Sequence, residues 1–296
     1  MDFLHTLRLE TLLLAQMVRN KVKNVLFHMS KRNLSRIERF RNIHNQETCV
    51  IFGDGTSLKW MDLSIFSDYP ALALNYFPFH KDNEKLNVKY SVFSEPWYFY
   101  PYIHPWVGGI KQPLWRNRIQ REYKSLIDER VSTSFFVSLS NYPTLFKRKN
   151  VYFLFKEIEN FQFYDDCQLR GQNIFGGSLR WAIFLAIFMG FKKIILVGCD
   201  YTHREALAHH WYEFGKSFFH QLPDYNKEFF EVAMRYASIE TITLKGGGSV
   251  LPSKVYAGTL NYKENSELTT SQKLELLSSY PGYRVFHNEA GLKATD

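Results

Sequence analysis

Cysteine is scarce in this chain, and several familiar motifs are missing altogether. The 296 residues include three cysteines, Cys49, Cys167 and Cys199, which form no CxxC pair. This spacing excludes a disulfide framework and a structural zinc site, and it fits a reducing compartment. There is no GxxxxGK[ST] phosphate loop and no GxGxxG dinucleotide fingerprint. RRM, KH and zinc-knuckle signatures are also missing, so we expect no nucleic-acid partner.

Long apolar runs are absent as well. A membrane-spanning helix needs about 20 apolar residues, and the leucine-rich stretches of residues 1–41 are much shorter. Asp2 and Glu10 argue against a secretory signal. Residues 1–41 become strongly basic towards their end, which leaves two interpretations. They form an amphipathic helix on an anionic membrane surface, or an ordinary helix packed on protein with a solvated basic face.

The composition is that of a globular chain. Hydrophobic residues make up 45% and aromatic residues 17%, enough to fill a large interior. We expect residues 1–44 to be a basic amphipathic helical segment and residues 45–296 to be one domain with a lid around 202–225. The formal net charge of +8 favours an anionic partner. The expected location is the cytoplasm, at the inner face of the membrane; homo-oligomer formation stays open.

A β-rich apolar run at residues 48–52 ends in the glycine turn GDGTSL. A buried strand that enters such a turn can present backbone N–H groups to a phosphate. The alternative is a plain strand-to-helix turn, because Gly commonly marks turns. Further strands are predicted at residues 71–75 and 88–93, which places Asn75 and Glu95 at strand ends. In an open parallel sheet this edge binds ligands.

The clearest pattern lies in the second half of the chain. Residues 179–189 are apolar nearly all round and predict a buried helix, and residues 193–197 predict a strand. With further strands at 131–139 and 151–155, the pattern predicts an α/β, Rossmann-like, mostly parallel sheet flanked by helices. The strand at 193–197 then delivers GCDYT to the same carboxyl edge.

Four of the ten histidines follow this strand within eighteen residues: His203, His209, His210 and His220. An imidazole titrates near neutral pH, so one of them as general base is a hypothesis. A hydrogen-bonded structural role is the alternative for each. Metal ligation is disfavoured, because neither an acidic partner nor HExxH spacing accompanies them.

Three blocks resemble, in order, the bacterial lipooligosaccharide sialyltransferases of glycosyltransferase family 42. They are VIFGDGTSLKWMD, NIFGGSLRWAIFLAIFMGFKKIILVGCDY and a helix and strand at residues 226–244. LALNYF and SVFSEPW match further segments between the first two, so the resemblance covers about residues 48–244. Rossmann-like motility-associated glycosyltransferases and pterin or nucleotide diphosphokinases share similar G-x-D strand ends and are the alternative.

The resemblance implies an inverting enzyme that moves a sialic acid or related nonulosonic acid from a CMP-activated donor to a glycan or glycolipid acceptor. It implies no cofactor and no metal, and a place in lipooligosaccharide, capsule or other glycan biosynthesis. The residues it assigns to the nucleotide sugar are Gly53, Asp54, Gly55, Ser57, Asn75, Glu95, Gly177, Ser178, Asp200, Tyr201 and Thr202. The family usually has Asn in place of Asp54 and Glu95, and a carboxylate beside a phosphate is repulsive.

The resemblance also implies the residues that act in the transfer. It places the general base at His220, with His210 as the second candidate. Tyr212 is the substitute for a family tyrosine that binds the leaving phosphate.

Overall fold

The computed structural model describes most of the chain between residues 35 and 278. The described residues are 17, 21, 25, 32–33, 35–95, 98–99, 112–154, 177–202, 205–207, 209–213, 219–221, 227–245 and 251–278. Most of the basic segment 1–41 and half of the expected lid, 202–225, lie outside them, so both expectations stay predictions. No helix among the described residues is long and apolar enough to cross a bilayer.

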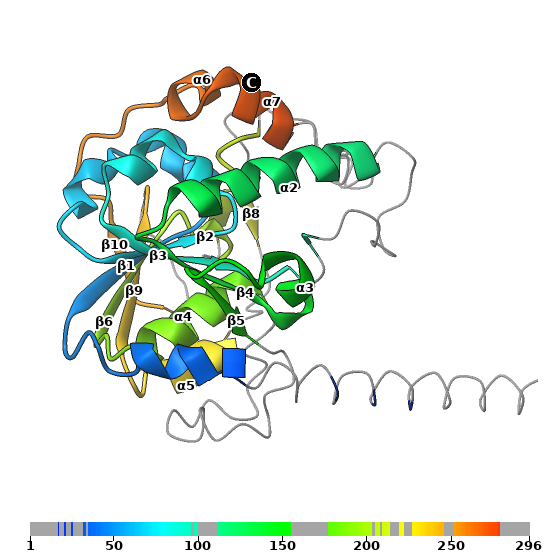
Figure 1. Cartoon of the computed structure of the whole chain (residues 1–296). Coiled ribbons are helices and arrows are strands. Elements are labelled where there is room, and N and C mark those ends of the chain that lie inside the picture. Colours follow the sequence, from blue (N-terminus) through cyan, green and yellow to red (C-terminus); the bar gives the residue numbers. More distant parts are fainter. Residues whose placement is uncertain are drawn as a thin grey trace, which may run out of the picture.

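One parallel sheet forms the centre of the molecule (Figure 1). Its eight strands lie in the order β10-β9-β6-β1-β2-β3-β4-β5, and all neighbours are parallel. The strands are β1 (Thr48–Phe52), β2 (Ala71–Leu74), β3 (Val88–Phe93), β4 (Ser134–Ser138), β5 (Val151–Leu154), β6 (Lys193–Val197), β9 (Ser238–Thr243) and β10 (Ser253–Val255). The predicted α/β, Rossmann-like class is confirmed.

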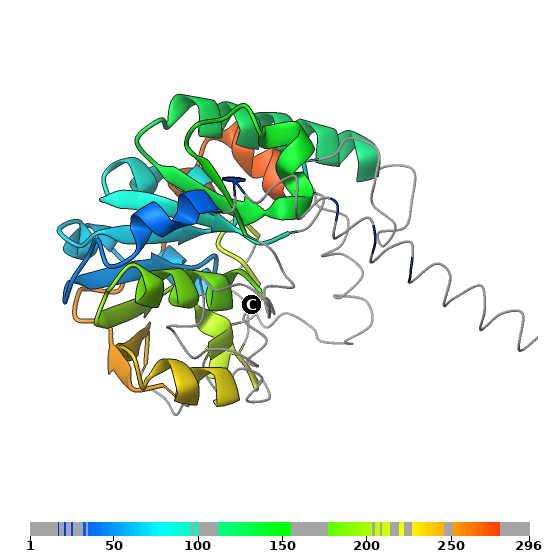
Figure 2. The same ribbon diagram turned by 60° about the horizontal axis from the view of Figure 1, so that its bottom comes forward.

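Helices cover both faces of this sheet (Figures 1 and 2). On one face lie α2 (Gln112–Glu129) and α7 (Ser271–Ser278), and on the other α4 (Ser178–Phe188) and α5 (Lys227–Ala233). Strands buried on both faces are mostly apolar rather than alternating, which is why runs such as TCVIF are readable in the sequence. The shorter α-helices are α3 (Tyr142–Leu145) and α6 (Asn265–Leu268). The short 3-10 helices are η1 (Ser35–Phe40), η2 (Thr56–Trp60), η3 (Leu63–Phe66), η4 (Phe77–Phe79), η5 (Lys81–Glu84), η6 (Leu139–Asn141) and η9 (Asp200–Thr202).

The chain changes direction between β1 and β6. From β1 the strands proceed outward to β5, and the chain then returns to place β6 on the other side of β1. The two strands are in register from Thr48 beside Lys193 to Phe52 beside Val197, so they end at the same level. Ligands of open α/β sheets bind outside the carboxyl ends of strands at such a switch point.

The last residues of the predicted segment 1–44 pack onto the sheet. Ile37 and Phe40 of η1 are buried, and the Phe40 ring makes edge contacts with Phe136 and Tyr152. His44 Nε2 lies 2.6 Å from the Tyr90 hydroxyl. Residues 35–44 therefore belong to the core, and the expected separate segment is limited to residues before them.

Candidate functional site

The ends of β1 and β6 are joined by glycine amides. Gly53 N donates to Val197 O at 2.8 Å and Gly55 N to Gly198 O at 2.7 Å. A Cβ on Gly55 would lie 2.6 Å from that same carbonyl oxygen, so a side chain there would force the strand ends apart. The amides of Gly53 and Gly55 are thus used within the protein. These glycines permit close approach of two strand ends, and their contact with a nucleotide sugar stays a prediction.

Asp200 binds the start of η2. Its carboxylate accepts hydrogen bonds from Ser57 N at 2.8 Å and from Ser57 Oγ at 2.5 Å, and its side chain is buried. Burial raises the pKa of Asp200 to about 6, against the lowering effect of both Ser57 bonds. Asp200 and Ser57 therefore hold the turn after β1 against the turn after β6, and their contact with a nucleotide sugar stays a prediction.

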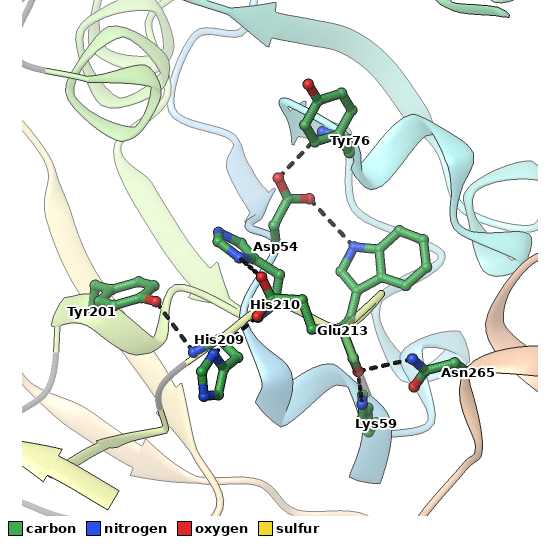
Figure 3. Close-up of polar contacts among 9 residues, drawn as sticks. Asp54, Lys59, Tyr76, Tyr201, His209, His210, Glu213 and Asn265 are labelled. Carbon is green, nitrogen blue, oxygen red and sulfur yellow. Dashed lines mark hydrogen bonds and ion pairs between the residues drawn. The ribbon is translucent and has the colours of Figure 1, made fainter. Parts of the chain in front are cut away.

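Asp54 is the second buried carboxylate at this edge (Figure 3). Its Oδ2 accepts from Tyr76 N at 3.2 Å and its Oδ1 from Trp211 Nε1 at 3.3 Å. Burial raises the pKa of Asp54 to about 6, while the charge of His210 and these hydrogen bonds lower it. Both oxygens are directed to protein donors, so the carboxylate has partners that offset the cost of its burial.

A hydroxyl cluster joins the next two strands to α4. Ser178 Oγ donates to Asn75 Oδ1 at 2.5 Å and lies 2.8 Å from Ser94 Oγ. Asn75 has a φ of 41°, which turns the chain sharply after β2. Gly177 precedes the helix with a φ of 142°, a conformation that favours glycine. The structure thus brings Asn75 and Ser178 into contact, and their binding of a nucleotide sugar stays a prediction.

Residues 209–213, here called the histidine turn, lie against the end of β1. Glu213 Oε2 lies 3.1 Å from His209 Nδ1, and Glu213 Oε1 lies 3.5 Å from His210 Nδ1 (Figure 3). Glu213 Oε2 also accepts from His210 N at 3.0 Å. Burial raises the pKa of Glu213, but the hydrogen bonds from both histidines and the charge of His210 outweigh it and lower the pKa to about 2. Glu213 is therefore ionised.

This arrangement has a chemical consequence for His210. An ionised carboxylate only accepts hydrogen bonds, so the imidazole Nδ1 facing it carries a proton and Nε2 is the nitrogen that can accept one. The ring is stacked on Tyr212 with centroids 5.1 Å apart, and Tyr212 is buried with its ring edge-on to Tyr76. His210 keeps 23% of its side chain exposed. An oriented, reachable imidazole of this kind suits a general base.

The remaining predicted residues lie around this centre. Tyr201 is exposed, and its hydroxyl accepts from His209 N at 3.2 Å. Thr202 Oγ1 donates to Cys199 O at 2.7 Å. Glu95 is exposed, and its carbonyl accepts from Asn141 Nδ2. His220 lies in β8 (Phe219–Gln221), which pairs with β7 (Glu205–Leu207), and its side chain lies outside the described part of the chain.

Sequence reasoning missed the residues that hold the histidine turn: Trp211, Glu213, Lys59 and Asn265. Glu213 follows His210 by three positions, a spacing that could have suggested the ion pair. Asn265 lies 52 positions beyond its partner Glu213, so no local sequence pattern indicates their contact. Among the described residues no group of three or more His, Cys, Asp or Glu side chains is arranged to hold a metal ion.

Comparison with known proteins gives a likeness of structure. No family model matches this chain, and no curated protein matches it. Among solved structures, monofunctional alpha-2,3-sialyltransferase Cst-I from Campylobacter jejuni is 18% identical, with 83% of this chain and 94% of that chain covered and a TM-score of 0.44. MAf glycosyltransferase from Magnetospirillum magneticum AMB-1 is 11% identical, with coverages of 88% and 44% and a TM-score of 0.43. Sialyltransferase CstII from Campylobacter jejuni, in complex with cytidine-5'-monophosphate, is 15% identical, with coverages of 78% and 96% and a TM-score of 0.40. Likeness at this level concerns the arrangement of the chain and assigns no activity.

Proposed function

We propose that this protein is a glycosyltransferase that moves a sialic acid, or a related nonulosonic acid, from a CMP-activated donor to a glycan or glycolipid acceptor. The supporting observation is that four segments that carry the sequence resemblance converge at one sheet edge. They are the turns after β1, β2 and β6 and the start of α4. This edge includes the switch point between β1 and β6, where open α/β sheets bind nucleotides.

The proposed reaction is an inverting transfer without a cofactor or metal. CMP leaves the anomeric carbon through an oxocarbenium-like transition state, and the acceptor hydroxyl loses a proton as it attacks from the opposite face. His210 is suited to take that proton at Nε2, because Glu213 faces Nδ1. His220, which the sequence resemblance implies, is the competing base. The leaving phosphate is stabilised by hydrogen-bond donors of the site, Tyr212 among the candidates.

The donor assignment is tested by thermal shift with CMP, UDP, GDP and ATP. A ligand that binds only the folded state stabilises it, by about 2.7 kcal/mol at a hundredfold excess over its Kd. We expect CMP to raise the melting temperature and the other nucleotides to have much smaller effects. Ser178→Ala should reduce the CMP shift, because Ser178 joins Asn75 to α4. Ser125→Ala is the matched control, since Ser125 is exposed and donates to Glu129 within α2.

The reaction is tested by incubating the protein with CMP-sialic acid and a lactose-terminated acceptor, with and without EDTA. We expect transfer and CMP release in both cases. Equal stabilisation by UDP would remove the cytidine assignment, and a strict need for Mg²⁺ with ATP would favour the diphosphokinase alternative.

A further inference from the structure

Two buried side chains bind one carbonyl oxygen of the histidine turn. Lys59 Nζ donates to Glu213 O at 2.5 Å, and Asn265 Nδ2 donates to the same oxygen at 2.8 Å (Figure 3). Lys59 is 0% exposed and Asn265 4% exposed. A buried ammonium is costly unless it is hydrogen-bonded, so this carbonyl is a partner that Lys59 needs.

The two donors come from parts of the chain that are attached to each other. Asn261 N donates to Trp60 O at 3.0 Å, and Lys263 N donates to Lys59 O at 2.7 Å. These bonds fix the residues before α6 along η2. Lys59 and Asn265 therefore reach the Glu213 carbonyl from one joined support rather than from two independent elements.

The other side of the histidine turn is bound to the turn after β1. Trp211 N donates to Asp54 O at 2.9 Å, and His210 forms an isolated β-bridge with Gly55. His209, at the start of the turn, has a φ of 73°, a conformation that costs energy for a residue other than Gly. A strained residue persists only where the surrounding contacts determine it, and here the contacts of the residues that follow His209 do so.

We propose that Lys59 and Asn265 are positioning residues for the histidine turn. By holding the Glu213 carbonyl they keep the Glu213 carboxylate between His209 and His210. The carboxylate in turn fixes the His210 imidazole beside Asp54. The effect on catalysis rests on the proposed function, whereas the effect on the two imidazoles does not. Both residues act through Glu213 and are assigned no contact with a substrate.

The test compares Asn265→Ala with Thr269→Ala. Thr269 is a matched control because it also ties the C-terminal part to the domain through a buried side-chain bond, from Oγ1 to Phe79 O at 2.9 Å, but not to the histidine turn. The imidazole nitrogen resonances of His209 and His210 are followed by NMR. A looser Glu213 carboxylate no longer fixes the proton on the two Nδ1 atoms that face it, so we expect these resonances to move in Asn265→Ala. They should stay unchanged in Thr269→Ala.

Kinetics provide the second measurement. We expect Asn265→Ala to lower kcat by roughly 10-fold to 100-fold with an unchanged KM for the donor, because misplacing a reacting group affects the chemical step. Lys59→Met alone should act similarly, and the double variant should lose more than the product of the single losses, since either donor partly holds the carbonyl alone.

Two results would overturn the positioning role. One is unchanged imidazole nitrogen resonances of both histidines in Asn265→Ala; the other is an equal change in Thr269→Ala, which would indicate general loosening. If Lys59→Met does not fold, the Asn265 and Thr269 variants still decide the matter. A protein that lacks transfer from CMP-sialic acid yet shows the expected changes in the imidazole nitrogen resonances would refute the proposed function and leave the positioning role standing.

Discussion

Trp211 is bound to Asp54 twice, once through its main chain and once through its indole. Its backbone N–H donates to the Asp54 carbonyl at 2.9 Å, and its Nε1–H donates to the Asp54 carboxylate at 3.3 Å. A single residue thus supports both the path of the histidine turn and the charge of a buried acid.

Trp211→Phe keeps the main-chain bond and removes the indole donor. A buried carboxylate that loses a donor carries an unfavourable desolvation cost, so the free energy of unfolding should fall by about 1–3 kcal/mol at pH 8. The loss should be smaller at pH 4.5, where Asp54 is protonated. Urea denaturation at both pH values measures it. Tyr76→Phe is the control, because it changes the hydroxyl bonded to Tyr98 but not the amide that binds Asp54.

Asp54→Asn should alter how stability depends on pH. The pKa of Asp54 is raised by burial from 3.8 to about 6, so the folded state holds a proton that the unfolded state has lost between these values. The contribution of Asp54 is therefore most favourable below pH 4 and is lost as pH rises through 6. Asn does not titrate. The free energy of unfolding of Asp54→Asn should therefore rise, relative to that of the unchanged protein, by up to about 3 kcal/mol between pH 4 and pH 7.5.

Denaturation curves across that range measure the Asp54 effect. Asp200 and Glu213 are present in both proteins, so their contributions cancel in the difference. Parallel pH curves for the two proteins would show that Asp54 keeps an ordinary pKa.

His210→Ala and His220→Ala distinguish the two candidate bases. Loss of the general base should lower kcat by roughly 10²–10⁴-fold while CMP binding changes little, because the base acts on the chemical step. The structure places His210 beside Asp54 and Glu213, so we expect the larger loss at His210. Transfer rates and CMP titrations measure the two effects. A large loss only at His220 would move the base to β8, and mild losses at both would remove histidine catalysis.

Deletions at the amino terminus should have different effects on either side of residue 35. Removal of residues 1–34 should leave a cooperative fold and weaken binding to anionic vesicles, by about 1 kcal/mol per membrane-facing Lys or Arg. Removal of residues 1–44 also takes away Ile37, Phe40 and the bond of His44 to Tyr90, and should destabilise the fold by several kcal/mol. Thermal unfolding and vesicle co-sedimentation measure the two effects. Unchanged vesicle binding after the shorter deletion would refute a membrane-facing role.

The central strands were predictable because burial on both faces gives them nearly unbroken apolar runs. TCVIF and KIILV could be found without knowledge of their neighbours, whereas β10, with the sequence SKV and two exposed residues, gave no such signal. The position of residues 35–44 was not predictable in this way. Their charge suggested a separate basic segment, and only the contacts of Phe40 and His44 with distant aromatic residues show that they belong to the core.

In the candidate site, the sequence indicated which turns lie at the sheet edge but not how they bind one another. Asp54, Asn75, Ser178 and His210 follow or precede readable elements, so their general location could be inferred. That Gly55 faces the Gly198 carbonyl, or that Asn265 reaches Glu213, depends on packing between residues far apart in the chain. Local periodicity holds no information about such contacts.

The pairing of β1 with β6 has a consequence for how the protein is made. Thr48 lies beside Lys193 in the finished sheet. β1 is the first strand to be synthesised, and its second neighbour, β6, is synthesised nearly 150 residues later. Until then the mostly apolar β1 stands at the edge of a half-built sheet, with unpaired main-chain groups that can recruit strands from other chains. Nascent chains that stall before β6 lack β6, β9 and β10 and keep this edge open, so they are the species most exposed to aggregation and most dependent on chaperones.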